Sequence, residues 1–169
     1  MNRTWMICLA AGVALAAPQY TSPAATASVA FGDKQVRISY HAPSMHGRQI
    51  FGGLVPYGQV WRAGANQATL LHTDVDLMIG NLTVPKGDYS LYVLPAEKEW
   101  TLIVNSQTGQ WGITHGGATT EDPAKDVGRV AMKLAKPAAP VETFAITLAK
   151  DSLSMSWENT VATVALGAK

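Results

Sequence analysis

Residues 47–71 read GRQIFGGLVPYGQVWRAGANQATLL and separate two parts of the chain that alternate regularly in hydrophobicity. This segment holds five glycines, one tryptophan and two arginines. Its apolar residues follow no helical period, so it is too irregular for a helix. We therefore expect a long irregular connection, and the fold class follows from the segments on either side of it.

Those flanking segments alternate with a period of two, as half-buried strands do. In 35–40, for example, Val36, Ile38 and Tyr40 fall on one face, and the Gly32-Asp33 pair before them suits a hairpin turn. The same pattern predicts strands at 28–31, 68–74, 76–79, 82–84, 89–94, 100–105, 127–134, 142–150, 153–158 and 160–166. Residues 107–126 lack such a pattern and predict a long surface loop. With no strongly amphipathic helix, the chain is predicted to be all-β, an antiparallel β-sandwich or jelly-roll-like barrel.

The first 16 residues predict a secretory signal peptide. Arg3 supplies the positive start, residues 5–16 form an apolar run, and Ala14-Leu15-Ala16 fits a cleavage site. The run is shorter than the roughly 20 residues that span a bilayer. Cys8 lies inside it, away from a lipidation motif. We expect export to the periplasm or the extracellular space, with no stable membrane span after cleavage.

The length of 169 residues fits one domain. We divide it into the signal peptide 1–16, a linker or lead-in 17–26, and a single β-sandwich domain 27–169. Removal of 1–16 takes away the single cysteine and leaves 12 basic and 12 acidic residues. The mature protein is then neutral and free of disulfides. This balance favours no nucleic-acid partner, and it leaves the oligomeric state open.

Several motifs resemble the bacterial family named domain of unknown function 2911. They are GRQIFGGLVPYGQVWRAGANQAT, LTVPKGDYSLYVLP, EWTLIVNSQTGQWG, DVGRV, VETF and SWENT, and the resemblance covers about residues 22–166. It implies a secreted or envelope-associated β-rich domain and supplies no activity. Two features depart from the family pattern as this resemblance implies it. Gln67 stands where Glu is usual, and residues 113–117 replace a Tyr- or Asp-containing loop.

The candidate ligand-binding residues are Arg48, Arg62, Asn66, Thr69 and Trp111. The first four concentrate hydrogen-bonding groups in the glycine-rich segment. An arginine fork beside aromatic faces suits a carboxylate, a phosphate or a sugar. The tryptophan follows a Gln-Thr-Gly-Gln turn and is the best candidate for an exposed stacking platform.

A structural interpretation of the same residues stands beside this one. Asn66 would cap loose backbone groups, Arg62 would pair with Glu158, and the glycines would supply positive φ angles. Asp126 is likewise expected to form a structural ion pair with Arg129. The sequence leaves the binding and structural interpretations open.

Sequence patterns for catalysis are weaker than those for ligand binding. The four histidines, His41, His46, His72 and His115, show no H-x-H pair that would place two ligands on one strand face, and no serine lies in a G-x-S-x-G elbow. We expect no metal and no cofactor. The favoured hypothesis is non-catalytic binding of a small polar ligand or envelope glycan. The alternatives are an envelope hydrolase or metal-dependent enzyme using His41, His46 or His72, and a structural or interaction scaffold.

Overall fold

A computed structural model describes residues 22–169. The predicted signal peptide at 1–16, its cleavage site, Cys8 and the first residues of the lead-in lie outside the described residues. None of the elements in 22–169 is a helix of the length and hydrophobicity that a membrane crossing requires.

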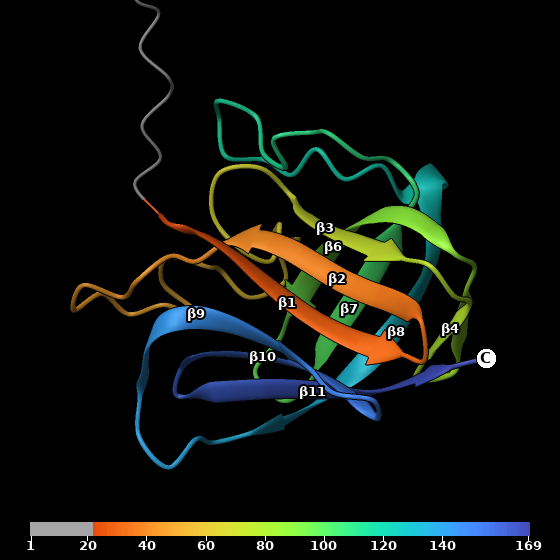
Figure 1. Cartoon of the computed structure of the whole chain (residues 1–169). Coiled ribbons are helices and arrows are strands. Elements are labelled where there is room, and N and C mark those ends of the chain that lie inside the picture. Colours follow the sequence, from red (N-terminus) through yellow and green to blue (C-terminus); the bar gives the residue numbers. More distant parts are fainter. Residues whose placement is uncertain (1–21) are drawn as a thin grey trace, which may run out of the picture.

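The described chain is a single all-β domain of eleven strands, as predicted (Figure 1). The strands are β1 Ala24–Phe31, β2 Lys34–His41, β3 Thr69–Thr73, β4 Leu77–Ile79, β5 Leu82–Val84, β6 Gly87–Pro95, β7 Trp100–Asn105, β8 Asp126–Ala135, β9 Val141–Leu148, β10 Ser152–Glu158 and β11 Thr160–Ala168. Every predicted strand is present. The first differs most, because it begins at Ala24 rather than Ser28 and so includes the end of the expected lead-in.

The strands form an antiparallel sheet that is nearly closed into a barrel. Its order is β1-β2-β3-β6-β7-β8-β11-β10-β9, and the short β4-β5 hairpin extends from the end of β11. The two ends of this order, β1 and β9, lie close together (Figure 1). The segment after β2 joins them: Ala42 N donates to Pro23 O at 2.8 Å, and Phe144 N donates to Pro43 O at 2.8 Å.

The period-two pattern places the core inside this barrel. In β2 the side chains of Val36, Ile38 and Tyr40 are buried, and those of Arg37 and Ser39 between them are exposed. The other strands contribute inward-facing apolar residues in the same way. Burial of one face of each strand is the main favourable term that holds the sheet together.

An aromatic cluster fills one end of the core. It consists of Phe51 and Trp61 from the irregular segment and Trp100, Phe144 and Trp157 from the strands. Trp61 lies nearly parallel to Trp157, with ring centroids 5.9 Å apart, and meets Phe144 edge to face at 5.1 Å. The irregular segment thus closes one end of the barrel with its own side chains.

The predicted long loop is present between β7 and β8, at residues 106–125, with one short 3-10 turn at Pro123–Lys125. It lies near the outer face of β6 and β7, where Tyr92 and Ile103 are fully buried. Gln110 connects the loop to this face, because its Nε2 donates to Tyr92 Oη at 2.8 Å and Ser90 Oγ at 2.9 Å.

Candidate functional site

Backbone strain gathers around residues 47–71, which we call the signature segment. In the described part of the chain four residues other than glycine have positive φ: His46 at 48°, Ala63 at 53°, Asn66 at 58° and Glu158 at 52°. Two lie in the segment, one lies just before it, and Glu158 contacts it. Such residues cost about 1–2 kcal/mol each and tend to cluster at functional sites.

The second half of the segment is a tight loop held by internal hydrogen bonds. Thr69 Oγ1 donates to Ala63 O at 2.7 Å, and Trp61 Nε1 donates to Gly64 O at 3.2 Å. A side chain at Gly64 would place its Cβ 2.9 Å from His41 O, so this close approach requires glycine. The loop is therefore rigid where it enters the core.

The first half is braced by Glu158, at the tip of the β10-β11 hairpin. Its carboxylate accepts hydrogen bonds from Ile50 N at 3.0 Å and Phe51 N at 3.4 Å. The expected ion pair between Arg62 and Glu158 is wrong. The carboxylate instead satisfies two backbone donors that the irregular segment leaves without a strand partner.

A pocket of about 390 Å³ opens between the signature segment and the 106–125 loop. The residues that matter most for its chemistry are Arg48, Leu54, Trp61, Arg62, Ile113 and Trp157. A second pocket of about 390 Å³ adjoins it, because Ser22, Pro43 and Arg48 line both. Ser44 and His46 belong to the second pocket alone.

Arg62 lines the first pocket and is half-buried. Its guanidinium carbon lies 5.7 Å from the centre of the Trp111 ring, and its Nη1 donates to Trp111 O at 3.2 Å. Burial lowers the pKa of Arg62, and an electrostatic effect of Tyr92 opposes this. The guanidinium stays charged at neutral pH, because its ordinary pKa is far higher.

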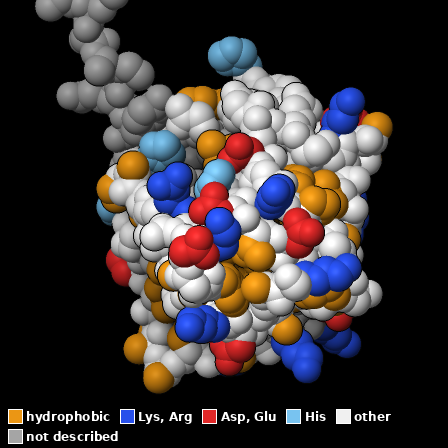
Figure 2. Space-filling view, turned by 45° about the vertical axis from the view of Figure 1, so that its right-hand side comes forward, with side chains coloured by type: hydrophobic (Ala, Val, Ile, Leu, Met, Phe, Trp, Pro, Cys, Tyr) orange, Lys and Arg blue, Asp and Glu red, His pale blue; other side chains and the backbone are white. Residues whose placement is uncertain are grey.

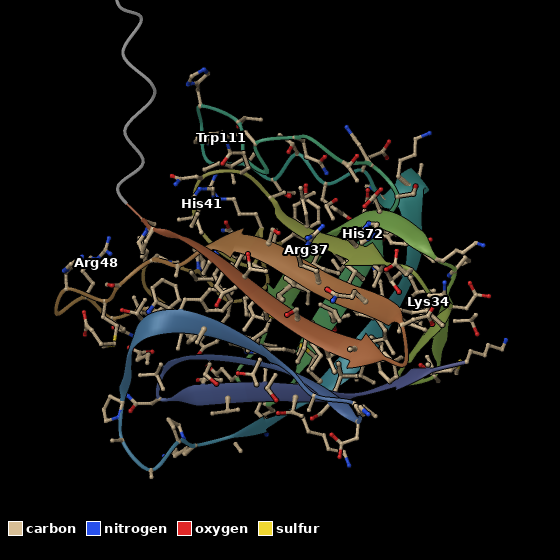
Figure 3. All side chains as sticks on the ribbon, in the orientation of Figure 1. Lys34, Arg37, His41, Arg48, His72 and Trp111 are labelled. Carbon is tan, nitrogen blue, oxygen red and sulfur yellow. The ribbon has the colours of Figure 1, made fainter. Side chains whose placement is uncertain are left out.

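Arg48 lies in the first half of the segment, near its start. It lies on the loop that projects on the left of Figure 3. Its Nε donates to Met45 O at 2.9 Å and its Nη2 to Ser44 O at 2.7 Å. These bonds fix the guanidinium against its own loop, and Arg48 lines both pockets.

The other three candidates lie elsewhere. Thr69 is fully buried and its hydroxyl serves the loop. Asn66 is also buried, and among residues 22–169 its Nδ2 has no hydrogen-bond partner. Trp111 is exposed and stacks against Arg62, but neither pocket includes it. The structure thus brings Arg48 and Arg62 to one pocket and leaves Asn66, Thr69 and Trp111 outside its lining.

A comparison with family models places the chain in a known group. The model described as "Protein of unknown function (DUF2911)" matches residues 22–166. The chain belongs to the DUF2911 family. Searches among curated proteins and among solved structures found no match to the chain.

The two departures that the resemblance implies have different places in the structure. Gln67 is half-buried and does not line the pocket. Ile113 and Gly117, from the 113–117 stretch, do line it. Sequence reasoning missed Ile113, together with Leu54, Pro56 and Gln59 of the pocket wall, since apolar and amide residues in loops have no distinctive pattern.

The histidines do not come together. His41 lies near Arg62, and burial followed by the arginine's charge lowers the pKa of His41, whereas His46 lines the second pocket. His72 lies beside Arg37 on the outer face of β2 and β3 (Figure 3). Among residues 22–169, no three His, Cys, Asp or Glu side chains are placed to hold a metal ion.

His72 has carboxylates on both sides. Its Nδ1 lies 2.7 Å from Asp88 Oδ1 and its Nε2 lies 3.2 Å from Asp74 Oδ1. These hydrogen bonds, the one to Asp88 first, raise the pKa of His72. Basic, acidic and histidine side chains are likewise interspersed over the face shown in Figure 2. The cluster acts as an ion network on the surface of the sheet.

A second ion network anchors the base of the 106–125 loop. Arg129 Nε lies 2.7 Å from Asp126 Oδ2, which confirms the predicted ion pair, and its Nη2 lies 2.8 Å from Glu121 Oε1. Asn105 Nδ2 donates to Asp126 Oδ1 at 2.8 Å. Burial, followed by the hydrogen bond with Asp126, raises the pKa of Glu121 even though Arg129 opposes this. These groups fix the loop that forms one wall of the pocket.

Proposed function

We propose that this DUF2911 protein is an exported, non-catalytic domain that binds a small polar ligand or an envelope glycan in the pocket of the signature segment. The observation that carries the proposal is that Arg48 and Arg62, from the two halves of that segment, line one pocket together with Trp61. Export rests on the sequence of residues 1–16. The pocket volume of about 390 Å³ falls within the range of about 300–1,000 Å³ typical of small-molecule sites.

The pocket has the rigidity that binding favours. Glu158 holds the first half of the segment, and Thr69 and Gly64 hold the second. A site that is formed before the ligand arrives loses less conformational entropy on binding. The left-handed residues around it are consistent with strain retained for function.

A scaffold role is the second candidate, and a separate observation favours it. The signature segment places Ile50, Phe51 and Val55 in the core and closes the end of the barrel. The segment would then be needed for stability, and its pocket would be a consequence of irregular packing.

A thermal-shift screen tests binding against the scaffold role. The panel contains organic carboxylates, phosphate esters and neutral saccharides, each added to the wild type, Arg62→Ala and Arg37→Ala. Arg37 is the matched control, because it is exposed on β2 and lines neither pocket. A ligand present at 100 times its Kd stabilises the fold by about 2.7 kcal/mol, which raises the Tm of a domain of this size by about 5–10 °C.

Binding predicts that at least one compound shifts the wild type and Arg37→Ala, and that Arg62→Ala loses this shift while its own Tm stays close to that of the control. If no compound shifts the wild type and Arg62→Ala unfolds at a much lower temperature than Arg37→Ala, the scaffold role replaces the proposal.

A further inference from the structure

The charges that line the two pockets are all of one sign. Arg48 and Arg62 are the charged side chains there, and among the described lining residues neither pocket contains Asp or Glu. Arg129, by contrast, is paired with the carboxylates of Asp126 and Glu121. The described lining of the two pockets therefore carries positive charge and no negative charge.

Arg62 makes this imbalance costly. It is half-buried, and its contacts in the described chain are with a neutral carbonyl and the face of Trp111 rather than a carboxylate. A charge removed from water without an opposite charge is unfavourable, whereas a guanidinium pairs especially well with the two oxygens of a carboxylate or phosphate. An anion in the pocket would supply the missing partner.

Apart from Ser22 and Gln59, the remaining side chains of the first pocket's lining are apolar. Trp61 and Trp157 are stacked at 5.9 Å and an interplanar angle of 20°, and both line the first pocket. Leu54 and Val55 add aliphatic surface, and the exposed Leu54 keeps part of this surface in contact with solvent. Such a wall favours an aromatic ring or a short hydrocarbon body over a fully hydrated ion.

We propose that the pocket selects an organic anion, with an apolar body against the Trp61 wall and a carboxylate or phosphate group held by Arg62 and Arg48. This inference rests on the proposed binding function and names its ligand class. It differs from binding of a neutral glycan, which would have no use for two charged arginines. Neutral sugars are therefore expected to be poor ligands.

Isothermal titration calorimetry with three compounds of one ring size tests this selection. The purified protein is titrated with 2-naphthoate, 2-naphthyl phosphate and the neutral 2-naphthalenemethanol. Charge-assisted hydrogen bonds predict that at least one anion binds about 10- to 100-fold more tightly than the alcohol. The ratio between the two anions shows whether a carboxylate or a phosphate is the better match.

Three variants assign the effect to the arginines. Arg62→Gln should remove most of the preference for the anion, and Arg48→Gln, whose guanidinium is exposed, should reduce it about two- to fivefold. Arg37→Gln, outside both pockets, should leave it unchanged. Circular dichroism and the Tm establish whether each variant is folded. If Arg62→Gln does not fold, Arg48→Gln serves as the test.

The outcomes separate the two proposals. If the alcohol binds as tightly as the anions, or if the panel shows binding of neutral saccharides alone, the anion inference is overturned and the binding function stands. If neither the anions nor any compound of the panel binds, both fail. Equal anion affinity in the wild type, Arg48→Gln and Arg62→Gln also overturns the inference, because binding then lies elsewhere on the protein.

Discussion

The placement of Arg62 depends on the single residue Gly112. Arg62 lies against Trp111, and the backbone immediately after Trp111 passes so close that a Cβ at Gly112 would be 2.7 Å from the Arg62 Cβ and 2.9 Å from its Cδ. Gly112 also has a φ of 94°. Both facts require glycine here, one because of space and the other because of backbone conformation.

Gly112→Ala is predicted to destabilise the protein more than Gly109→Ala. Gly109 is the matched control, since it lies in the same loop at a φ of 83° and has open space around it. In both variants the free energy of unfolding falls by about 1–2 kcal/mol, because alanine is strained in the left-handed backbone conformation. In Gly112→Ala it should fall by about 1–3 kcal/mol more, because Arg62 or the loop must move. Urea unfolding measures the difference, and equal losses would show that the contact with Arg62 yields without cost.

The sequence motifs include the residues of the contact between Arg62 and Trp111, but they do not predict that the two side chains meet. Arg62, Trp111 and Gly112 all belong to motifs noticed in the sequence, but the two motifs are far apart in the chain. A guanidinium stacked on a tryptophan ring has no local sequence pattern. The two side chains meet only when the 106–125 loop folds over β6 and β7. The ion pair of Arg62 with Glu158, which the sequence also allows, is wrong, because the Glu158 carboxylate accepts hydrogen bonds from the backbone of Ile50 and Phe51 instead.

At the scale of elements, Glu158 links the β10-β11 hairpin to the signature segment. It occupies the tight turn with a φ of 52° and holds two backbone donors of a segment distant in sequence. The strands on either side were predictable because their hydrophobic alternation is local. The link between the β10-β11 hairpin and the signature segment was not predictable. It depends on backbone N–H groups, and these give no signal in a sequence because nearly every residue has one.

Replacing this carboxylate is predicted to loosen the end of the barrel. Glu158→Ala leaves the N–H groups of Ile50 and Phe51 without an acceptor, which should lower the free energy of unfolding by about 2–4 kcal/mol. Glu158→Gln keeps one acceptor oxygen and should lose about half as much. Glu99→Ala, in the exposed β6-β7 turn, is the control for loss of a surface carboxylate.

Denaturant unfolding and amide hydrogen exchange at Ile50 and Phe51 measure this effect. Exchange should become faster at those two amides in Glu158→Ala and remain unchanged in Glu99→Ala. A loss of stability without faster exchange there would place the effect in the turn itself, through its left-handed residue, rather than in the link.

For the whole molecule, the sequence left a sandwich and a barrel open, and long-range contacts between the ends of the sheet decide in favour of the nearly closed barrel. The edge strand β9 is covered by the chain that follows β2: Met45 N donates to Glu142 O at 2.8 Å, and Ser44 bridges to Thr143. Covering an edge in this way removes a row of unpaired backbone groups that would otherwise favour aggregation. The hydrophobic alternation in the sequences of β2 and β9 does not indicate that the chain after β2 pairs with β9.

Tyr40 offers the sharpest test of that closure. Its hydroxyl, buried in the barrel, accepts a hydrogen bond from Ile146 N at 3.0 Å, and its ring meets Phe144 edge to face at 5.6 Å. Tyr40→Phe keeps the ring and removes the acceptor. The unfolding free energy should then fall by about 1–3 kcal/mol, because a backbone donor in the closed seam loses its partner.

The control is Tyr57→Phe, which removes the same hydroxyl from an exposed side chain and should change stability by less than about 0.5 kcal/mol. Hydrogen exchange distinguishes a local effect from a global one: the Ile146 amide should exchange faster in Tyr40→Phe, while amides of β6 and β7 in the middle of the sheet change only with global stability. Unchanged exchange at Ile146 would mean that the backbone bonds of residues 42–45 close the barrel without the tyrosine, and that its hydroxyl contributes nothing to the seam.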